Sequence, residues 1–333
     1  MAAIKSYKGF DKNLKCRGFQ YEIGKEYEMD GEIKVCSRGF HACESPLEVF
    51  DHYSMIGSRF CEVEQDGNIS KEDRGTKICS SKIKIKAELK LDNMINLGVE
   101  WLKDITSPEK IKTSIKDNSS GDGAKIGSSG NYAQIGSSGD GAQIGSSGYY
   151  AKIGSSGDGA QIGSSGYNAQ IGSSGYNAQI GSSGDGAKIG SSGNYAKIGS
   201  SGYNAQIGSS GDGAQIGSSG NYAQIGSSGD DAKIGSSGDD AKIGSSGDYA
   251  KIGSSGDDAK IDSTGEGCVI MCAGINSVAK ASKGSWITLS EWSYSDKKKR
   301  YIPVCVKTEF VDGEKIKADT YYKLAGGVFK EIQ

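Results

Sequence analysis

The stretch "GSSGDGAQIGSSGYYAKIGSSG" at residues 136–157 repeats one nine-residue phrase with small changes. Alanine recurs at every ninth position from Ala124 to Ala259, sixteen times, and isoleucine follows two residues later from Ile126 to Ile261. Lysine or glutamine stands between them, and Gly-Ser-Ser-Gly follows until the last copy, which reads Asp-Ser-Thr-Gly. A flexible Gly/Ser tether, the alternative, has no reason to keep two apolar residues in register. We therefore interpret the repeats as a folded array.

Each copy reads as a short strand followed by a corner. In Ala-Lys/Gln-Ile the first and third side chains of a strand share one side, so Ala and Ile are expected to face a core and Lys or Gln to face solvent. Gly-Ser-Ser-Gly is expected to form the corner. Burying one isoleucine contributes about 1.5–3 kcal/mol, whereas ordering each residue costs about 1–2 kcal/mol. A single copy is therefore unstable and a stack is stable.

The sequence thus predicts a mainly β protein, with a parallel β-solenoid (a β-helix or β-roll) over residues 111–274. Two copies per coil are favoured over three. The two varying residues of each copy repeat every two copies in the first six and every three copies in the next six, so both periods occur. The ends depart from the consensus as terminal repeats of stacked arrays do. "SIKDNSSG" (114–121) is a half-formed copy, and "GCVIMCAG" (267–274) continues the phase with Cys268 in the alanine place and Ile270 in the isoleucine place.

The flanking regions have ordinary mixed composition. Residues 1–110 are expected to form a small α+β domain, and residues 275–333 a β-rich C-terminal domain. In the first, we expect strands within 16–28 and 32–43 joined by a turn at Asp30-Gly31, a helix capped by Ser45, and a helix over 92–105. In the last, Asp312-Gly313 and Gly326-Gly327 indicate turns between antiparallel strands.

Composition narrows the classes of function. The chain has 39 Lys+Arg against 41 Asp+Glu, which indicates neither a DNA-coating protein nor an acidic tail. There is no long apolar run and no secretory signal, so we expect a cytoplasmic protein that does not enter a membrane. The eight cysteines lie outside the sixteen repeats and are expected to be reduced, with no metal site and no cofactor.

The varying positions are the candidate binding surface. Two residues between each corner and the next alanine change from copy to copy, and tyrosine is frequent there. Exposed tyrosine combines a rigid apolar face with a hydroxyl group and is a common contact residue. Covering of the core edges by these rings is the structural alternative. The candidate binding residues are Tyr132, Tyr149, Tyr150, Tyr167, Tyr176, Tyr195, Tyr203, Tyr222, Lys125, Lys152, Lys188 and Lys197.

Other chemical readings have less support. A calcium-binding nonapeptide roll needs a regular Asp ladder, which tyrosine and asparagine interrupt here, and outward Lys and Gln argue against an ice-binding face. With two histidines, the chain is not expected to be an enzyme. One enzymatic alternative remains: the order of "CRGFQY", "GFHACESPLEVFDHY" and "RFCEVE" loosely resembles ADP-ribosyltransferases, which would assign NAD binding to Arg17, His41, Ser45 and Glu64.

Both end regions also resemble an uncharacterised domain family found mostly in bacteriophages and prophages. The resemblance lies in "KGFDKNLKCRGFQYEIGKEYE", "GFHACESPLEVFDHY" and "SRFCEVEQDG", and in a tail with "GSWITLSEW" and "VDGEKIKADTYYKL". It implies a phage-type protein that acts in the host cytoplasm. We expect a non-catalytic binding protein that inhibits a host defence protein or sequesters a nucleotide signal, and thin parallel solenoids of this kind are expected to self-associate as homo-oligomers. The alternative is a structural or assembly component of a phage particle.

Overall fold

The computed structural model describes residues 3–55, 57–72, 75–106 and 121–332. The chain divides into two compact units, Met1–Trp101 and Leu102–Gln333, and each is described by itself. The half-formed copy expected at 114–121 lies almost wholly outside the described residues.

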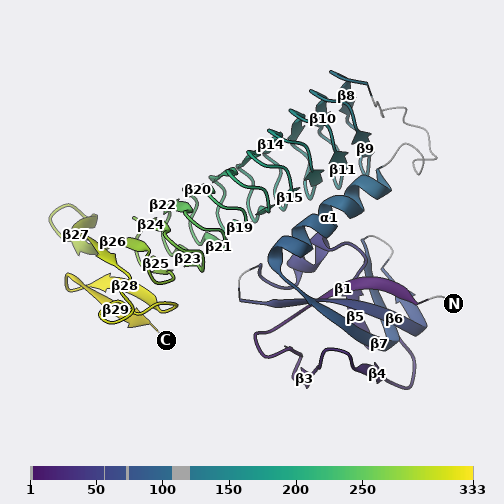
Figure 1. Cartoon of the computed structure of the whole chain (residues 1–333), viewed down its shortest axis with the longest axis horizontal. Coiled ribbons are helices and arrows are strands. Elements are labelled where there is room, and N and C mark those ends of the chain that lie inside the picture. Colours follow the sequence, from purple (N-terminus) through teal and green to yellow (C-terminus); the bar gives the residue numbers. More distant parts are fainter. Residues whose placement is uncertain (1–2, 56, 73–74, 107–120, 333) are drawn as a thin grey trace. The chain divides into compact units, whose positions relative to one another are not determined.

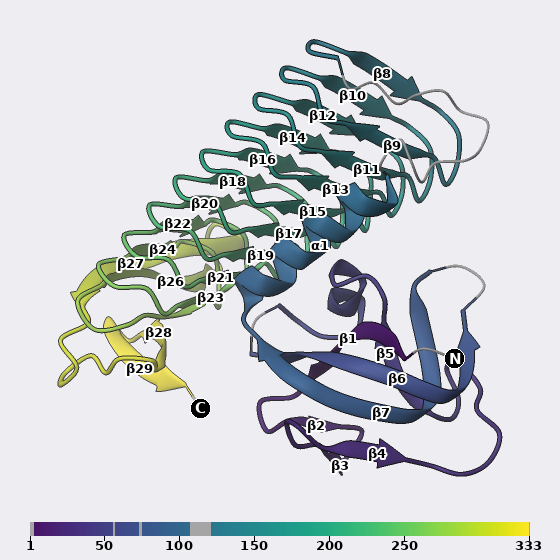
Figure 2. The ribbon, with the colours of Figure 1, turned by 45° about the vertical axis from the view of Figure 1, so that its right-hand side comes forward.

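The second unit contains the predicted parallel β-solenoid (Figure 1). Each strand pairs in parallel with the strand eighteen residues away, as Ile144 does with Ile126 and Ile162, so one coil contains two copies as predicted. Successive copies therefore alternate between two sheets. Figure 2 shows the coils stacked along one axis.

We call the two faces of the coil sheet 1 and sheet 2. The coil strands of sheet 1 are β8 Lys125–Ser128, β10 Gln143–Ser146, β12 Gln161–Ser164, β14 Gln179–Ser182, β16 Lys197–Ser200, β18 Gln215–Ser218, β20 Lys233–Ser236, β22 Lys251–Ser254 and β24 Val269–Cys272. Those of sheet 2 are β9 Gln134–Ser137, β11 Lys152–Ser155, β13 Gln170–Ser173, β15 Lys188–Ser191, β17 Gln206–Ser209, β19 Gln224–Ser227, β21 Lys242–Ser245, β23 Lys260–Ser263 and β25 Val278–Lys280.

The strand is shifted along the repeat from where the sequence placed it. It reads Lys/Gln-Ile-Gly-Ser, so the first glycine and first serine belong to the strand and not to the corner. Alternation then turns Ile144 and Ser146 into the core, at 4 % and 7 % exposed, and Gln143 and Gly145 outward. Alanine lies at the end of the corner and is buried, as predicted. The corner itself is Ser-Gly and the two varying residues.

The second glycine of each corner sets how closely two coils approach. A Cβ atom at Gly220 would overlap the carbonyl oxygen of Gly202 in the preceding coil, and the same overlap recurs from Gly139 to Gly274. A Cβ at Gly217, the first glycine of the same copy, would meet nothing within 4 Å. The two glycines of one copy therefore have different physical reasons to be glycine.

The C-terminal strands continue both sheets of the solenoid. β26 (Trp286–Ser295) pairs in parallel with β24, and β27 (Arg300–Phe310) pairs antiparallel with β26. β28 (Tyr321–Ala325) follows β25 in sheet 2 and forms a hairpin with β29 (Val328–Ile332). The predicted Gly326-Gly327 turn connects that hairpin, with both residues at positive φ. Cys268 and Ile270 occupy the core places predicted for them.

The first unit is built around a closed arrangement of strands. β6 (Arg59–Lys71) and β7 (Lys77–Leu89) form a long hairpin, β1 (Ile4–Phe10) pairs with β6, and β5 (Phe40–Cys43) pairs with both β1 and β7. β4 (Glu26–Glu28) pairs with β7 farther along the edge that β5 uses, and β2 (Lys15–Cys16) pairs with β3 (Phe19–Gln20). Buried apolar side chains such as Phe10, Val63 and Ile83 fill the interior.

Two local expectations for this unit were wrong. Residues 16–28 and 32–43 do not pair through a turn at Asp30-Gly31. β5 and β4 instead pair with successive stretches of β7, along the edge that β6 leaves free. The helix after Ser45 is a five-residue 3-10 helix, η1 (Leu47–Asp51), with Pro46 at its N-cap and no side-chain cap. The helix predicted over 92–105 is α1 (Leu91–Ile105), with Met94, Ile95 and Val99 buried.

Candidate functional site

The two varying residues of each corner have different conformations. The second one has a positive φ throughout, from 54° to 66°, whether it is glycine, asparagine, aspartate or tyrosine. Glycine adopts this region freely, and asparagine and aspartate adopt it more readily than other residues. The backbone thus explains the Gly, Asn and Asp at this place but not the tyrosines.

The first varying residue forms a ladder along the stack when it is Asp or Asn. The backbone N–H of Asp140 donates to Oδ1 of Asp122 at 3.0 Å, and that of Asp158 donates to Oδ1 of Asp140 at 2.9 Å. The same bond recurs in the later coils, for instance from Asp257 to Asp239. Aspartate at this place is therefore a structural residue that supports the next corner, which the sequence did not reveal because tyrosine interrupts the series.

The corner tyrosines lie on two opposite edges of the solenoid. We call the corners that precede sheet 1 strands edge 1, and those that precede sheet 2 strands edge 2. Edge 1 contains Tyr176, Tyr195 and Tyr249, and edge 2 contains Tyr132, Tyr149, Tyr150, Tyr167, Tyr203 and Tyr222. Their exposed fractions range from 41 % at Tyr150 to 62 % at Tyr249, so the rings are accessible.

Edge 2 has the denser cluster. The rings of Tyr132 and Tyr150 stack in parallel with centroids 5.2 Å apart, and Tyr150 meets Tyr167 edge-on at 6.3 Å. Farther along, Tyr203 and Tyr222 lie 5.0 Å apart. These pairs join successive coils, which agrees with the expectation that the rings cover corners, yet each ring keeps a large exposed face.

Five tyrosines adopt a left-handed backbone conformation that is unfavourable for a bulky residue. Tyr132, Tyr150, Tyr195, Tyr222 and Tyr249 have φ between 57° and 61°. A bulky residue in the left-handed region is an outlier, with a cost of about 1–3 kcal/mol. Because neighbouring coils use glycine or asparagine at the same place, the fold does not require these rings. Backbone outliers of this kind cluster at functional sites, so these five tyrosines are candidates for contact residues.

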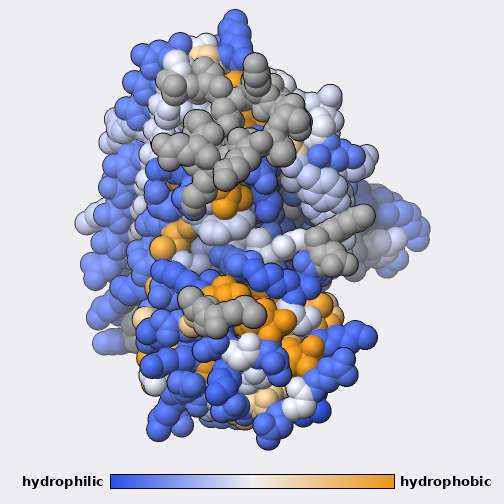
Figure 3. Space-filling model, turned by 90° about the vertical axis from the view of Figure 1, so that its right-hand side faces the viewer, coloured by the Kyte–Doolittle hydropathy of each residue, from blue (hydrophilic) through white to orange (hydrophobic). Residues whose placement is uncertain are grey.

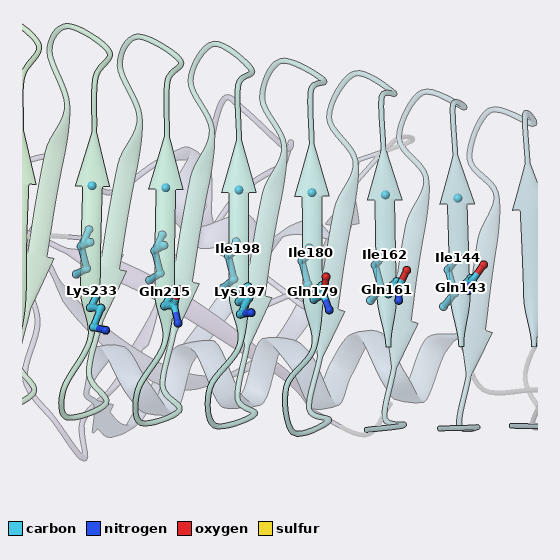
Figure 4. A pocket seen from close by; sticks show the side chains of 18 of the residues that line it. Gln143, Ile144, Gln161, Ile162, Gln179, Ile180, Lys197, Ile198, Gln215 and Lys233 are labelled. Atoms are coloured by element: carbon cyan, nitrogen blue, oxygen red, sulfur yellow. The ribbon is translucent and has the colours of Figure 1, made fainter. Parts of the chain in front are cut away.

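The candidate lysines do not join the tyrosines in one site. Lys125 and Lys197 line a shallow groove of about 1280 Å³ along the outer face of sheet 1, formed because the outward glycines leave space beside a row of long polar side chains. Figure 4 shows Gln143, Gln161, Gln179, Lys197, Gln215 and Lys233 in that row.

Lys152 and Lys188 lie on sheet 2, where the expectation of solvent exposure was wrong for Lys188. Its exposed fraction is 6 %. Lys152 is half-buried.

The first unit contains a pocket that the sequence did not predict. It encloses about 890 Å³ and brings together residues from β1, β4, β5, the start of β7 and the segments around β2, β3 and η1. The Nζ atom of Lys8 donates to the carbonyl oxygen of His41 at 2.8 Å and lies 3.6 Å from Sγ of Cys16. Cys16 in turn lies 2.9 Å from the hydroxyl of Tyr53. The sequence feature that could have indicated this pocket is Lys8, a charged residue within the strand segment "YKGF".

The four residues of the ADP-ribosyltransferase alternative are not brought together. Arg17 and His41 line the pocket. Ser45 is fully buried and its backbone N–H donates to Oγ1 of Thr76 at 3.0 Å, and Glu64 pairs with Lys86 at 2.9 Å, so neither is a lining residue. The arrangement does not support a joint role for these four side chains.

Lys8 predicts a pH dependence of stability for the first unit. Its side chain is 4 % exposed, and burial lowers its pKa below the ordinary 10.5. The unfolded chain therefore binds more protons, and the free energy of unfolding rises with pH from the folded-state pKa of Lys8 toward 10.5. Burial raises the pKa of Cys43 and Cys61 from 9.0 to about 12, which opposes this trend at higher pH.

The measurement is urea unfolding of the full chain from about pH 7 to 10.5, followed by a probe of the first unit. Above the folded-state pKa of Lys8, we expect the native chain to gain stability with pH relative to Lys8→Met. An equal slope in both proteins would assign the effect to another group.

Comparison with known proteins gives one match. The model of a domain of unknown function (DUF7666) matches residues 4–97, which agrees with an uncharacterised domain in the first unit. Comparison with curated proteins found no match, and comparison with solved structures found none either. Within the described ranges, three or more metal-ligating side chains do not gather anywhere, and none of the helices has the length and apolar character to cross a bilayer. The face in Figure 3 is mostly hydrophilic.

Proposed function

We propose that this chain is a non-catalytic binding protein that uses edge 2 of the solenoid to hold a protein partner. The observation that carries this proposal is the set of exposed tyrosines in left-handed backbone conformation. Tyr132, Tyr150 and Tyr167 form a continuous aromatic surface across three coils, and Tyr149 lies beside them. Rigid aromatic side chains clustered in this way are typical of binding hot spots.

The parallel solenoid supports this function by fixing the spacing of the side chains. Neighbouring strands of a sheet lie about 4.8 Å apart, and the corner hydrogen bonds hold each copy in register. The partner that we propose is a host defence protein, and the chain would then be a phage-type protein acting in the host cytoplasm. The resemblance of both end regions to phage domains supports this assignment. A spacer in a phage particle is the alternative, but a spacer has no use for strained tyrosines.

The test compares two edges with matched substitutions. Tyr132→Asn with Tyr150→Asn alters edge 2, and Tyr195→Asn with Tyr249→Asn alters edge 1 at the same backbone position. Asparagine fits this conformation, so both variants should fold and melt no lower than the native chain. We expect a partner captured from host lysate by the native chain to be retained by the edge 1 variant and lost from the edge 2 variant. Equal retention by all three proteins would contradict the proposal.

A further inference from the structure

Three basic side chains line the pocket in the first unit. Lys8 from β1, Arg17 after β2 and Lys77 at the start of β7 all line it, together with His41. Contacts link them to the same segment: Nζ of Lys8 donates to the carbonyl oxygen of His41 and lies 3.6 Å from Sγ of Cys16, the neighbour of Arg17, and Nζ of Lys77 lies 3.5 Å from Sγ of Cys36. Burial lowers the pKa of His41. The ring of His41 is fixed because its Nε2 accepts the backbone N–H of Cys36 at 3.0 Å.

These cations have no anionic partner in the part of the chain that the structure describes. Lys8 contacts the carbonyl oxygen of His41, the thiol of Cys16 and the ring faces of Phe10 and Tyr21, while Lys77 lies 3.5 Å from Sγ of Cys36. No ion pair joins Lys8, Arg17 or Lys77 to a described carboxylate. Three carboxylates line the same pocket, Glu26, Glu28 and Asp51, and Glu28 is paired with Lys82 at 3.0 Å. Burial disfavours the charged form of Lys8, and a bound anion would offset that cost and favour its ammonium form.

Aromatic rings form another wall of the pocket. Phe19, Tyr21 and Tyr27 contact one another, with centroids 4.7 to 5.4 Å apart. Phe19 is 47 % exposed although it belongs to this cluster, so an apolar face is open at the pocket. Open aromatic faces stack on planar rings, and the base of a nucleotide is such a ring.

The backbone around the cations is strained. Arg17 has a φ of 49° and Cys36 a φ of 63°, and both line the pocket. The Cys36 conformation directs its N–H to His41. Outliers of this kind gather at ligand sites, where the surrounding fold holds side chains in a fixed geometry. The volume of about 890 Å³ lies within the range of small-molecule sites.

We propose that this pocket binds a nucleotide, with the phosphate between Lys8, Arg17 and Lys77 and the base against Phe19 and Tyr27. The cation set supplies the charge that a phosphate requires, and the aromatic wall supplies the stacking surface. Ser45 and Glu64 lie elsewhere, so the proposed role is binding without group transfer. The proposal is independent of the tyrosine edges of the solenoid.

The test is calorimetric titration of the full chain with AMP, GMP, CMP and UMP, with the four nucleosides, and with inorganic phosphate. We expect at least one nucleotide to bind at one site per chain, and its nucleoside and free phosphate to bind at least about tenfold more weakly. Lys77→Ala and Phe19→Ala should each weaken that nucleotide by about tenfold or more. Lys84→Ala removes a lysine of β7 outside the pocket and should leave the affinity unchanged.

Three results would overturn the proposal. The first is the absence of binding by every nucleotide at millimolar concentration. The second is equal affinity for a nucleotide and its nucleoside, which removes the phosphate from recognition. The third is an equal effect of Lys77→Ala and Lys84→Ala. Binding at several sites per chain that Lys77→Ala does not alter would place the nucleotide on the exposed tyrosines instead.

Discussion

Replacing Gly220 by alanine is expected to disrupt the solenoid, whereas replacing Gly217 in the same copy is expected to leave it intact. The new Cβ of Gly220→Ala would overlap the carbonyl oxygen of Gly202, a backbone atom that no side-chain rotation can move away. The two coils would have to separate, which breaks hydrogen bonds such as Ser219 N–H to Ser200 O at 3.0 Å. We expect a loss of about 3 kcal/mol or more.

Gly217→Ala is the matched control. Its Cβ would point away from the sheet into open space, and alanine is better than glycine in a strand by about 0.5–1 kcal/mol. Thermal melting followed by circular dichroism, with hydrogen exchange to locate the opening, separates the two variants. If both melted like the native chain, the close contact between the second glycines would not be a constraint on the stack.

The second large effect is expected at Gly39, in the first unit. This residue precedes β5, lines the pocket and has a φ of 130°, and a Cβ there would overlap Sγ of Cys79 and press on Ile33. Cys79 cannot yield easily, because it is fully buried and its thiol donates to the carbonyl oxygen of Arg38 at 3.0 Å. Gly39→Ala should therefore cost about 3 kcal/mol, from backbone strain and overpacking together.

Gly24→Ala separates these two causes. Gly24 has a φ of 83°, but a Cβ there would meet nothing within 4 Å. We expect a cost of about 1 kcal/mol from the backbone alone. Chemical denaturation of the full chain, monitored on the first unit, gives both values. Equal losses in the two variants would show that the space beside Cys79 is not limiting.

The solenoid was predictable because its signal is local and periodic. Ala142, Ile144 and their equivalents recur every nine residues. The alternation of the first varying pairs favoured two copies per coil, which the pairing of Ile144 with Ile162 confirms. The division of the repeat was not predictable to the residue. Gly217 and Gly220 look alike in the sequence. They differ in their distance to the neighbouring coil, which is defined only once the coils are stacked.

The pocket was not predictable because its parts are far apart in the sequence. Lys8, His41 and Lys77 lie on three strands, and the order β4-β7-β5-β1-β6 that joins them depends on long-range pairing. Arg17 and His41 were selected for a different reason, a resemblance that also selected Ser45 and Glu64. On the solenoid, the aspartates of the corner ladder escaped notice because tyrosines such as Tyr149 interrupt their series.

The coil of two copies has a consequence for how this gene can vary. Loss or gain of one nine-residue unit moves every following unit to the other sheet of the coil. A tyrosine such as Tyr203 would then lie on the opposite edge of the solenoid, although its own sequence is unchanged. Loss or gain of two units leaves every following unit on its own sheet and changes only the length of the solenoid. A change in the number of repeats can therefore either rearrange the surface of the solenoid or extend it. Neither change needs a point mutation.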